Sequence, residues 1–151
     1  MKINYIAIAI LIVAITTTKG FGQSNSTRTV SEAEAKKNQA ANDEFLRALQ
    51  TGDVSKLGDI AGPDFVNHGV GEKVGPDSLK ASIQTFYARF KPTKVEVKTR
   101  VMNGEYFGDW IKYTGANPGM VIEGIEMTRY SNGKAVEHWF FPGGQPRRRP
   151  Q

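Results

Sequence analysis

Two histidines are the residues of this chain best suited to acid–base chemistry, because imidazole is the side chain that gains and loses a proton near neutral pH. The 151-residue sequence has only these two, His68 and His138. Each stands among aromatic and acidic residues: His68 follows the run Asp64–Asn67, and His138 lies between Glu137 and Trp139. If the fold brings the two segments together, they form a pocket in which protons can be moved. The alternative is that both histidines are simply packed.

The composition limits other kinds of chemistry. The chain has no cysteine, which excludes disulfides, thiolate metal ligands and cysteine nucleophiles. The two histidines are 70 positions apart and form no metal-binding motif. The glycines at 69, 71 and 75 lack the spacing of a phosphate-binding loop. We therefore expect no metal and no cofactor.

Residues 1–22 have the pattern of a secretory signal peptide. Lys2 precedes the unbroken apolar run Ile6–Ile15, and Gly20 and Gly22 provide the small residues of a cleavage site. The run is too short to span a bilayer, which needs about 20 apolar residues. We expect cleavage after Gly22, export to the periplasm or the medium, and no stable membrane insertion after processing. The alternative is an uncleaved N-terminal anchor.

The net charge of +5 is concentrated at the two ends of the chain. Two lysines belong to the leader, and the arginines at 147–149 supply all of the remaining excess. Elsewhere acids and bases are interspersed, so the sequence does not indicate nucleic-acid binding. We divide the chain into a signal peptide (1–22), a flexible lead-in (23–30), one domain (31–142) and a disordered basic tail (143–151).

The hydrophobic period changes from 3.6 to 2 near residue 93, which predicts helices first and strands afterwards. The helical part contains a helix capped by Ser31 and ended by Gly52, a short helix capped by Asp53, and a helix from Pro76 to Phe90. A short extended piece, 65–68, separates the last two. Four strands follow, with hairpin turns at Asn-Gly pairs 103–104 and 132–133. This order predicts an α+β fold, with three N-terminal helices packed on a curved, mainly antiparallel sheet.

Four segments, in order, resemble those of the SnoaL-like polyketide cyclases of the nuclear-transport-factor-2-like (NTF2-like) superfamily. They are IAGPDFVNH (60–68), GPDSLK (75–80), GIEMTRY (124–130) and NGKAVEHW (132–139). The resemblance covers about residues 35–142. It implies a cone-shaped α+β barrel with a deep apolar pocket, and a homodimer formed through the sheet. Enzymes on this fold include ring cyclases, isomerases, dehydratases and epoxide hydrolases, whereas many relatives only bind ligands or partners.

The resemblance also implies a candidate acid/base. Glu126 takes the place of the family's acidic residue, and we expect it to act with His68 on a small hydrophobic, carbonyl-bearing ligand. Strand alternation places Glu126 on one face with Gly124 and Thr128, without deciding whether that face lines the pocket or meets solvent. Because His138 alternates with Trp139, and Trp139 is expected in the pocket, we expect His138 outside it.

Aromatic side chains are the candidates for the pocket wall, although in a small domain they are more often plain core. The expected ligand-binding residues are Phe65, Phe86, Tyr87, Trp110, Tyr113 and Trp139. Two hypotheses follow. The first is a cofactor-independent cyclase or isomerase. The second is a non-catalytic ligand-binding or protein-interaction module on the same scaffold. The absence of an acid just after Trp139, where the family has one, favours the second.

Overall fold

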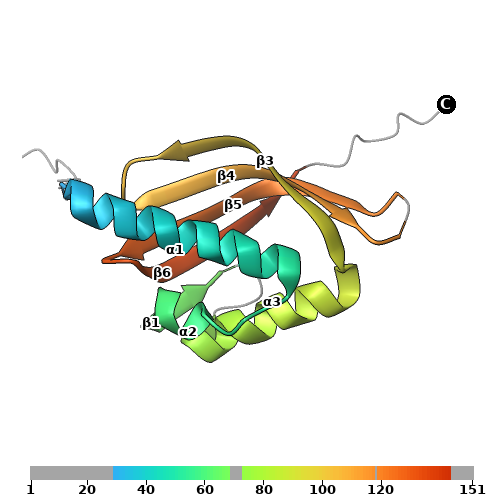
Figure 1. Ribbon diagram of the computed structural model, residues 1–151, viewed down its shortest axis with the longest axis horizontal. Coiled ribbons are helices and arrows are strands. Elements are labelled where there is room, and N and C mark those ends of the chain that lie inside the picture. Colours follow the sequence, from blue (N-terminus) through green and yellow to red (C-terminus); the bar gives the residue numbers. More distant parts are fainter. Residues whose placement is uncertain (1–28, 69–72, 118, 144–151) are drawn as a thin grey trace, which may run out of the picture.

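The computed structural model describes residues 29–68, 73–117 and 119–143. Three helices, α1 (Glu32–Thr51), α2 (Leu57–Ile60) and α3 (Pro76–Phe90), pack against one face of a curved sheet (Figure 1). The predicted α+β architecture is confirmed. Within the described part of the chain, no helix has the length and apolar character needed to cross a bilayer. The predicted leader, and all but the first residue of the predicted tail, lie outside the described residues.

The sheet has six strands in the order β2-β1-β6-β5-β4-β3. The strands are β1 (Ala61–Asn67), β2 (Lys73–Val74), β3 (Pro92–Met102), β4 (Tyr106–Gly115), β5 (Val121–Ser131) and β6 (Lys134–Pro142). The last four form the predicted antiparallel meander, and β1 adds to it in parallel with β6. This parallel pairing places the end of β1 beside the middle of β6, with Asn67 opposite His138.

The first helix begins and ends where the sequence predicts. The Ser31 side chain accepts a hydrogen bond from the backbone N–H of Glu34, and Gly52 closes the helix in the left-handed region, with φ 72°. A Cβ at Gly52 would lie only 2.6 Å from the ring of Tyr87 on α3. Glycine is therefore required here both by backbone conformation and by the close packing of α1 on α3.

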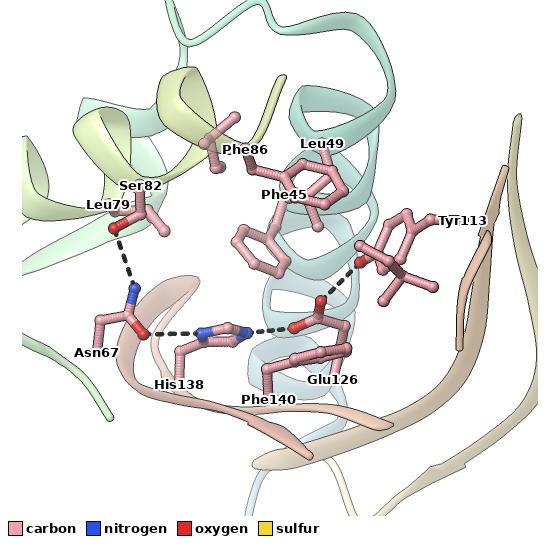
Figure 2. A pocket seen from close by; sticks show the side chains of 12 residues that line it. Phe45, Leu49, Asn67, Leu79, Ser82, Phe86, Tyr113, Glu126, His138 and Phe140 are labelled. Carbon is pink, nitrogen blue, oxygen red and sulfur yellow. Dashed lines mark hydrogen bonds and ion pairs between the residues drawn. The ribbon is translucent and has the colours of Figure 1, made fainter. Parts of the chain in front are cut away.

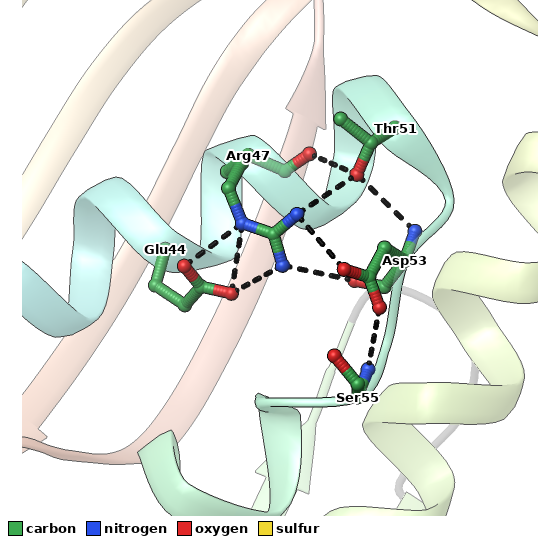
Figure 3. A network of polar contacts seen from close by, with 5 residues as sticks. All are labelled: Glu44, Arg47, Thr51, Asp53 and Ser55. Carbon is green, nitrogen blue, oxygen red and sulfur yellow. Dashed lines mark hydrogen bonds and ion pairs between the residues drawn. The ribbon is translucent and has the colours of Figure 1, made fainter.

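The prediction that Asp53 caps the second helix is wrong. That helix begins at Leu57, and its N-cap residue makes no side-chain capping bond. Asp53 instead accepts a hydrogen bond from the Ser55 N–H (3.0 Å) and pairs with Arg47 (3.1 Å), which also holds Glu44 (Figure 3). The bond from Ser55, assisted by Arg47, lowers the pKa of Asp53 to about 2. These contacts stabilise a turn in place of a further helical turn.

A β-bulge in β6 decides which side chains face the helices. Ala135 pairs with Tyr130 and Glu137 pairs with Arg129, so Val136 is an extra residue on this strand. In β5, alternate residues from Gly124 to Tyr130 are buried on the inner face. Beyond the bulge, His138 is the inward-facing partner of Thr128, and its neighbours in sequence point outward.

Candidate functional site

A cavity of about 170 Å³ lies between α1, α3 and the inner face of the sheet. Most of its wall is apolar, made by Phe45, Leu49, Leu79, Ile83, Phe86, Ile122 and Phe140. Five polar side chains complete it: Asn67, Ser82, Tyr113, Glu126 and His138 (Figure 2). The cavity is therefore suited to an apolar molecule with one polar group directed at the polar part of the wall.

Glu126 and His138 form a close, buried pair in this wall. The distance from Glu126 Oε2 to His138 Nε2 is 2.5 Å, and each residue is 7% exposed. No lysine or arginine is among the described residues that line the cavity. The imidazole is thus the group in this wall that can offset a negative charge on Glu126, and it can do so by taking up a proton.

Asn67 and Ser82 fix the position of the histidine's other proton. Ser82 Oγ donates to the Ser78 carbonyl (2.8 Å) and accepts from Asn67 Nδ2 (3.3 Å), which directs the amide oxygen of Asn67 toward His138. That oxygen lies 3.3 Å from His138 Nδ1 and can only accept, so Nδ1 carries a hydrogen. With a hydrogen on Nδ1, the 2.5 Å contact between Nε2 of His138 and Glu126 Oε2 is a hydrogen bond that needs one proton, on either atom.

Tyr113 supplies a hydrogen-bond donor to the other oxygen of the carboxyl group. Its hydroxyl donates to Glu126 Oε1 over 2.6 Å. Burial raises the pKa of the Tyr113 phenol well above its usual value, and the charge of the neighbouring Glu126 adds to the increase. The phenol therefore remains a donor throughout the neutral range. Each oxygen of the Glu126 carboxyl group thus has one hydrogen-bond partner, Tyr113 at Oε1 and His138 at Oε2.

The structure brings some of the predicted site residues together and separates others. Glu126, whose face the sequence left undecided, faces the cavity, and Tyr113 and Phe86 form part of its wall. The prediction that His138 lies outside the pocket is wrong, because the inward-facing side of β6 carries this residue and not Trp139. His68 is exposed, and its ring is stacked on that of Trp139 with centroids 4.8 Å apart. His68 and Glu126 are therefore not brought together as a pair.

Three other predicted ligand-binding residues lie elsewhere. Trp110 is 49% exposed on the outer face of the sheet. Tyr87 packs under Gly52 at the contact between α1 and α3. Phe65 is fully buried in the main core and is not part of the cavity wall. Phe65 and Tyr87 thus have packing positions, the alternative that applies to most aromatic residues of a small domain, whereas Trp110 lies on the surface.

Sequence reasoning missed Asn67 and Ser82 and misplaced His138. The signal for Ser82 was available, because it falls on the helical stripe of Leu79, Ile83 and Phe86. Asn67 and His138 depend on a parallel pairing between distant strands and on a bulge within β6. Neither feature leaves a local pattern in the sequence.

An α+β cone with an apolar cavity, enclosed between helices and a curved sheet, defines the NTF2-like fold, and solved structures match it. A protein assigned as a polyketide cyclase, from Bacillus cereus ATCC 10987, aligns with TM-score 0.64 and 20% identity over 75% of this chain and 78% of its own. TsrD from Streptomyces laurentii aligns with a TM-score of 0.60 and 17% identity, over 75% of this chain and 90% of its own. An NTF2-like protein of unknown function from Burkholderia xenovorans LB400 aligns with a TM-score of 0.60 and 21% identity, over 78% of this chain and 90% of its own.

The chain belongs to the SnoaL-like domain family, which matches residues 43–138. None of the curated proteins compared with this chain matches it in sequence. The matched segment includes Asn67, Ser82, Tyr113, Glu126 and His138, so the whole polar wall of the cavity lies within the family domain.

Proposed function

We propose that this protein is a cofactor-independent acid/base enzyme of the cyclase or isomerase type, acting on a small apolar carbonyl compound. The observation that carries the proposal is the 2.5 Å contact between Glu126 and His138 in the wall of an apolar cavity. A carboxyl group paired with an imidazole, away from any permanent cation, can both release and receive a proton.

The reaction starts from the form in which the shared proton is on His138 and Glu126 is a carboxylate. The carboxylate removes a proton from the carbon next to the ligand carbonyl, and the electron pair moves onto the carbonyl oxygen. Donors of the same wall, the imidazolium N–H of His138 and the hydroxyl of Tyr113, stabilise the resulting enolate. Return of the proton at another carbon completes an isomerisation. Alternatively, the enolate carbon attacks a second carbonyl and closes a ring, the π electrons of that carbonyl move onto its oxygen, and the alkoxide takes up the proton from Glu126.

The test is exchange of α-protons for deuterium, followed by proton NMR, in a neutral methyl ketone such as methyl para-acetylphenylbutanoate. Wild type should accelerate the exchange above the buffer rate. Glu126→Gln and His138→Gln should each abolish the acceleration, whereas His68→Gln, which changes the exposed histidine, should retain it. Exchange that survives in both cavity variants, or that disappears in His68→Gln, would contradict this assignment.

A non-catalytic ligand-binding module is the second candidate, and one observation favours it. The polar side chains of the cavity already bond one another in a continuous series from Ser82 through Asn67, His138 and Glu126 to Tyr113. A network satisfied in this way also stabilises a fold without doing chemistry. Saturable binding of the ketone with no exchange above buffer would support this candidate over the enzyme.

We also propose that the protein forms a homodimer through the outer face of its sheet. Trp110, Ile125 and Phe141 lie opposite one another on β4, β5 and β6, and they are 49%, 46% and 49% exposed. Such a row of large apolar side chains is typical of a protein interface. Light scattering should give twice the chain mass for wild type and the single chain mass for Ile125→Lys. A monomeric wild type at micromolar concentration would contradict it.

Export to the periplasm or the medium remains a proposal that rests on the sequence of residues 1–22. N-terminal sequencing of the protein recovered after expression with its leader should begin at Gln23. Recovery of the intact N-terminus with the membrane fraction would favour an uncleaved anchor.

A further inference from the structure

A second, wider cavity adjoins the one that holds Glu126 and His138. It has a volume of about 650 Å³ and shares three wall residues with the inner cavity, namely Ser82, Phe86 and Ile122. The rest of its wall is formed by Ala81, Thr85, Arg89, Phe90 and Met120. The two cavities therefore meet at these three side chains.

One face of α3 forms a wall common to both cavities. Ser82, Phe86 and Arg89 are separated by four and three residues, which places them along a single helical face. Ser82 marks the inner end, because it bonds Asn67, which in turn contacts His138. Arg89 lies seven residues further on, about 10 Å along the helix axis at 1.5 Å per residue. Phe86 lies between them.

Arg89 is the single charged residue among the described residues that line the outer cavity. Among all the residues that the structure describes, no carboxylate is close enough to form an ion pair with Arg89. Arg47, Arg100 and Arg129, by contrast, each have acidic partners. Arg89 lies in the last turn of α3, where a cation interacts favourably with the helix dipole. This interaction explains a cation in the last turn, but it does not explain why the side chain lines a cavity.

We propose, on the basis of the function proposed above, that the ligand carries an anionic group at the end remote from its reacting carbonyl, and that Arg89 binds this group. The carbonyl lies at Glu126 and His138, and the apolar body of the ligand runs past Phe86 and Ile122. The opposite orientation is unfavourable, because an anion in the inner cavity would meet Glu126 in an apolar setting with no lysine or arginine in the described wall. The substrate class is thus an amphipathic keto acid.

The experiment compares two probes that differ only in charge, para-acetylphenylbutanoate and its methyl ester, by calorimetric titration of the full chain. Wild type should bind the acid about fivefold more tightly than the ester, near the upper end for an exposed ion pair. Arg89→Gln should bind the two equally. Lys91→Asn is the matched control: it removes an exposed cation two residues away that does not line the cavity, and asparagine tolerates the φ of 44° there.

Equal binding of acid and ester by wild type would overturn the proposal, and so would a preference that Lys91→Asn removes and Arg89→Gln leaves intact. Failure of both probes to bind would contradict the subsite and the ligand class together. The two proposals can fail separately. Exchange of the ester without preference for the acid would leave the enzyme function standing alone. An Arg89-dependent preference without any exchange would instead leave an anion-selective binding protein.

Discussion

Two buried carboxylates face each other across β4 and β5, and their surroundings differ. Asp109 and Glu126 are paired in register, both point toward the helices, and they are 1% and 7% exposed. Asp109 accepts two hydrogen bonds from Arg100, at 2.6 and 3.1 Å, and one from Asn42 at 2.9 Å. Glu126 has His138 and Tyr113 as partners. The first carboxylate faces a permanent cation and the second a group that exchanges protons.

The same residue type has a structural role at Asp109 and, in the proposed reaction, a chemical role at Glu126. The hydrogen bonds that Arg100 donates to Asp109 raise the pKa of the guanidinium still further above its usual range, so this pair has no proton to exchange. Asn42 also accepts a bond from Tyr130, which ties α1 to the sheet. At Glu126, the partner is an imidazole nitrogen 2.5 Å away, and both groups line a cavity. The partner, more than burial, distinguishes the two sites.

The largest expected effect is on catalysis at Glu126. Glu126→Gln keeps the shape of the side chain but removes the base, so α-proton exchange of the methyl ketone should slow by about 10²–10⁴-fold. Folding stability should change far less, because glutamine can still bond both Tyr113 and His138. The rate is measured by NMR and the stability by urea unfolding. A stable variant that retains the wild-type exchange rate would show that this carboxylate is not the base.

At Asp109 we expect a large effect on stability and a small effect on the exchange rate. Asp109→Asn leaves the guanidinium of Arg100 without its buried counter-charge, and the free energy of unfolding should fall by roughly 2–3 kcal/mol. The exchange rate per folded molecule should stay close to wild type. Urea titration followed by circular dichroism measures the first quantity. Loss of exchange in a fully folded Asp109→Asn sample would mean that the two carboxylates act together.

The third prediction concerns the positioning of His138. Asn67→Leu removes the acceptor opposite Nδ1, and exchange should slow about tenfold, as expected for loss of one buried hydrogen bond. Asn67→Asp restores an acceptor and should recover activity. The fall should appear in kcat more than in KM, because leucine keeps a side chain of similar size at this position of the cavity wall. A purely structural residue would instead change stability in both variants without this rescue.

The smallest expected effect is at alkaline pH. Burial raises the pKa of Tyr113 and of Tyr130 above the usual value of 10.0. A raised folded-state pKa contributes stability that is fully present below pH 10 and is lost as the pH rises from there toward the folded value. The unfolding free energy of wild type should therefore fall above about pH 10. Tyr113→Phe and Tyr130→Phe should each reduce this slope, and an unchanged slope in the double variant would contradict the assignment.

The fold could be predicted from local patterns because each element carries its own signal. The order of helices and strands follows from four local signals. These are the cap at Ser31, the helix end at Gly52, the change of hydrophobic period near residue 93 and the two Asn-Gly turns. The short second helix was misassigned because Asp53 has two competing partners, the N–H of Ser55 and the guanidinium of Arg47. Local capping rules do not rank such partners.

The site was only partly predictable, because its geometry depends on contacts between distant strands. Glu126 could be proposed from its motif, but only the buried alternation of β5 shows that it faces inward. The sequence pattern placed His138 outside the pocket because Trp139 was expected to line it. In the fold Trp139 stacks on His68 outside, and His138 takes the inner position beyond the bulge. A bulge adds one residue and reverses the facing of every position after it.

The proton between Glu126 and His138 is tested most directly by nitrogen NMR of the His138 ring in protein labelled with ¹⁵N-histidine. His68→Gln leaves His138 as the single histidine of the sequence, so its two ring nitrogens can be assigned without ambiguity. We expect a hydrogen on Nδ1 at neutral pH and an Nε2 signal that changes when Glu126→Gln is introduced. An Nδ1 without hydrogen, or an Nε2 signal that ignores Glu126→Gln, would show that the two side chains do not share a proton.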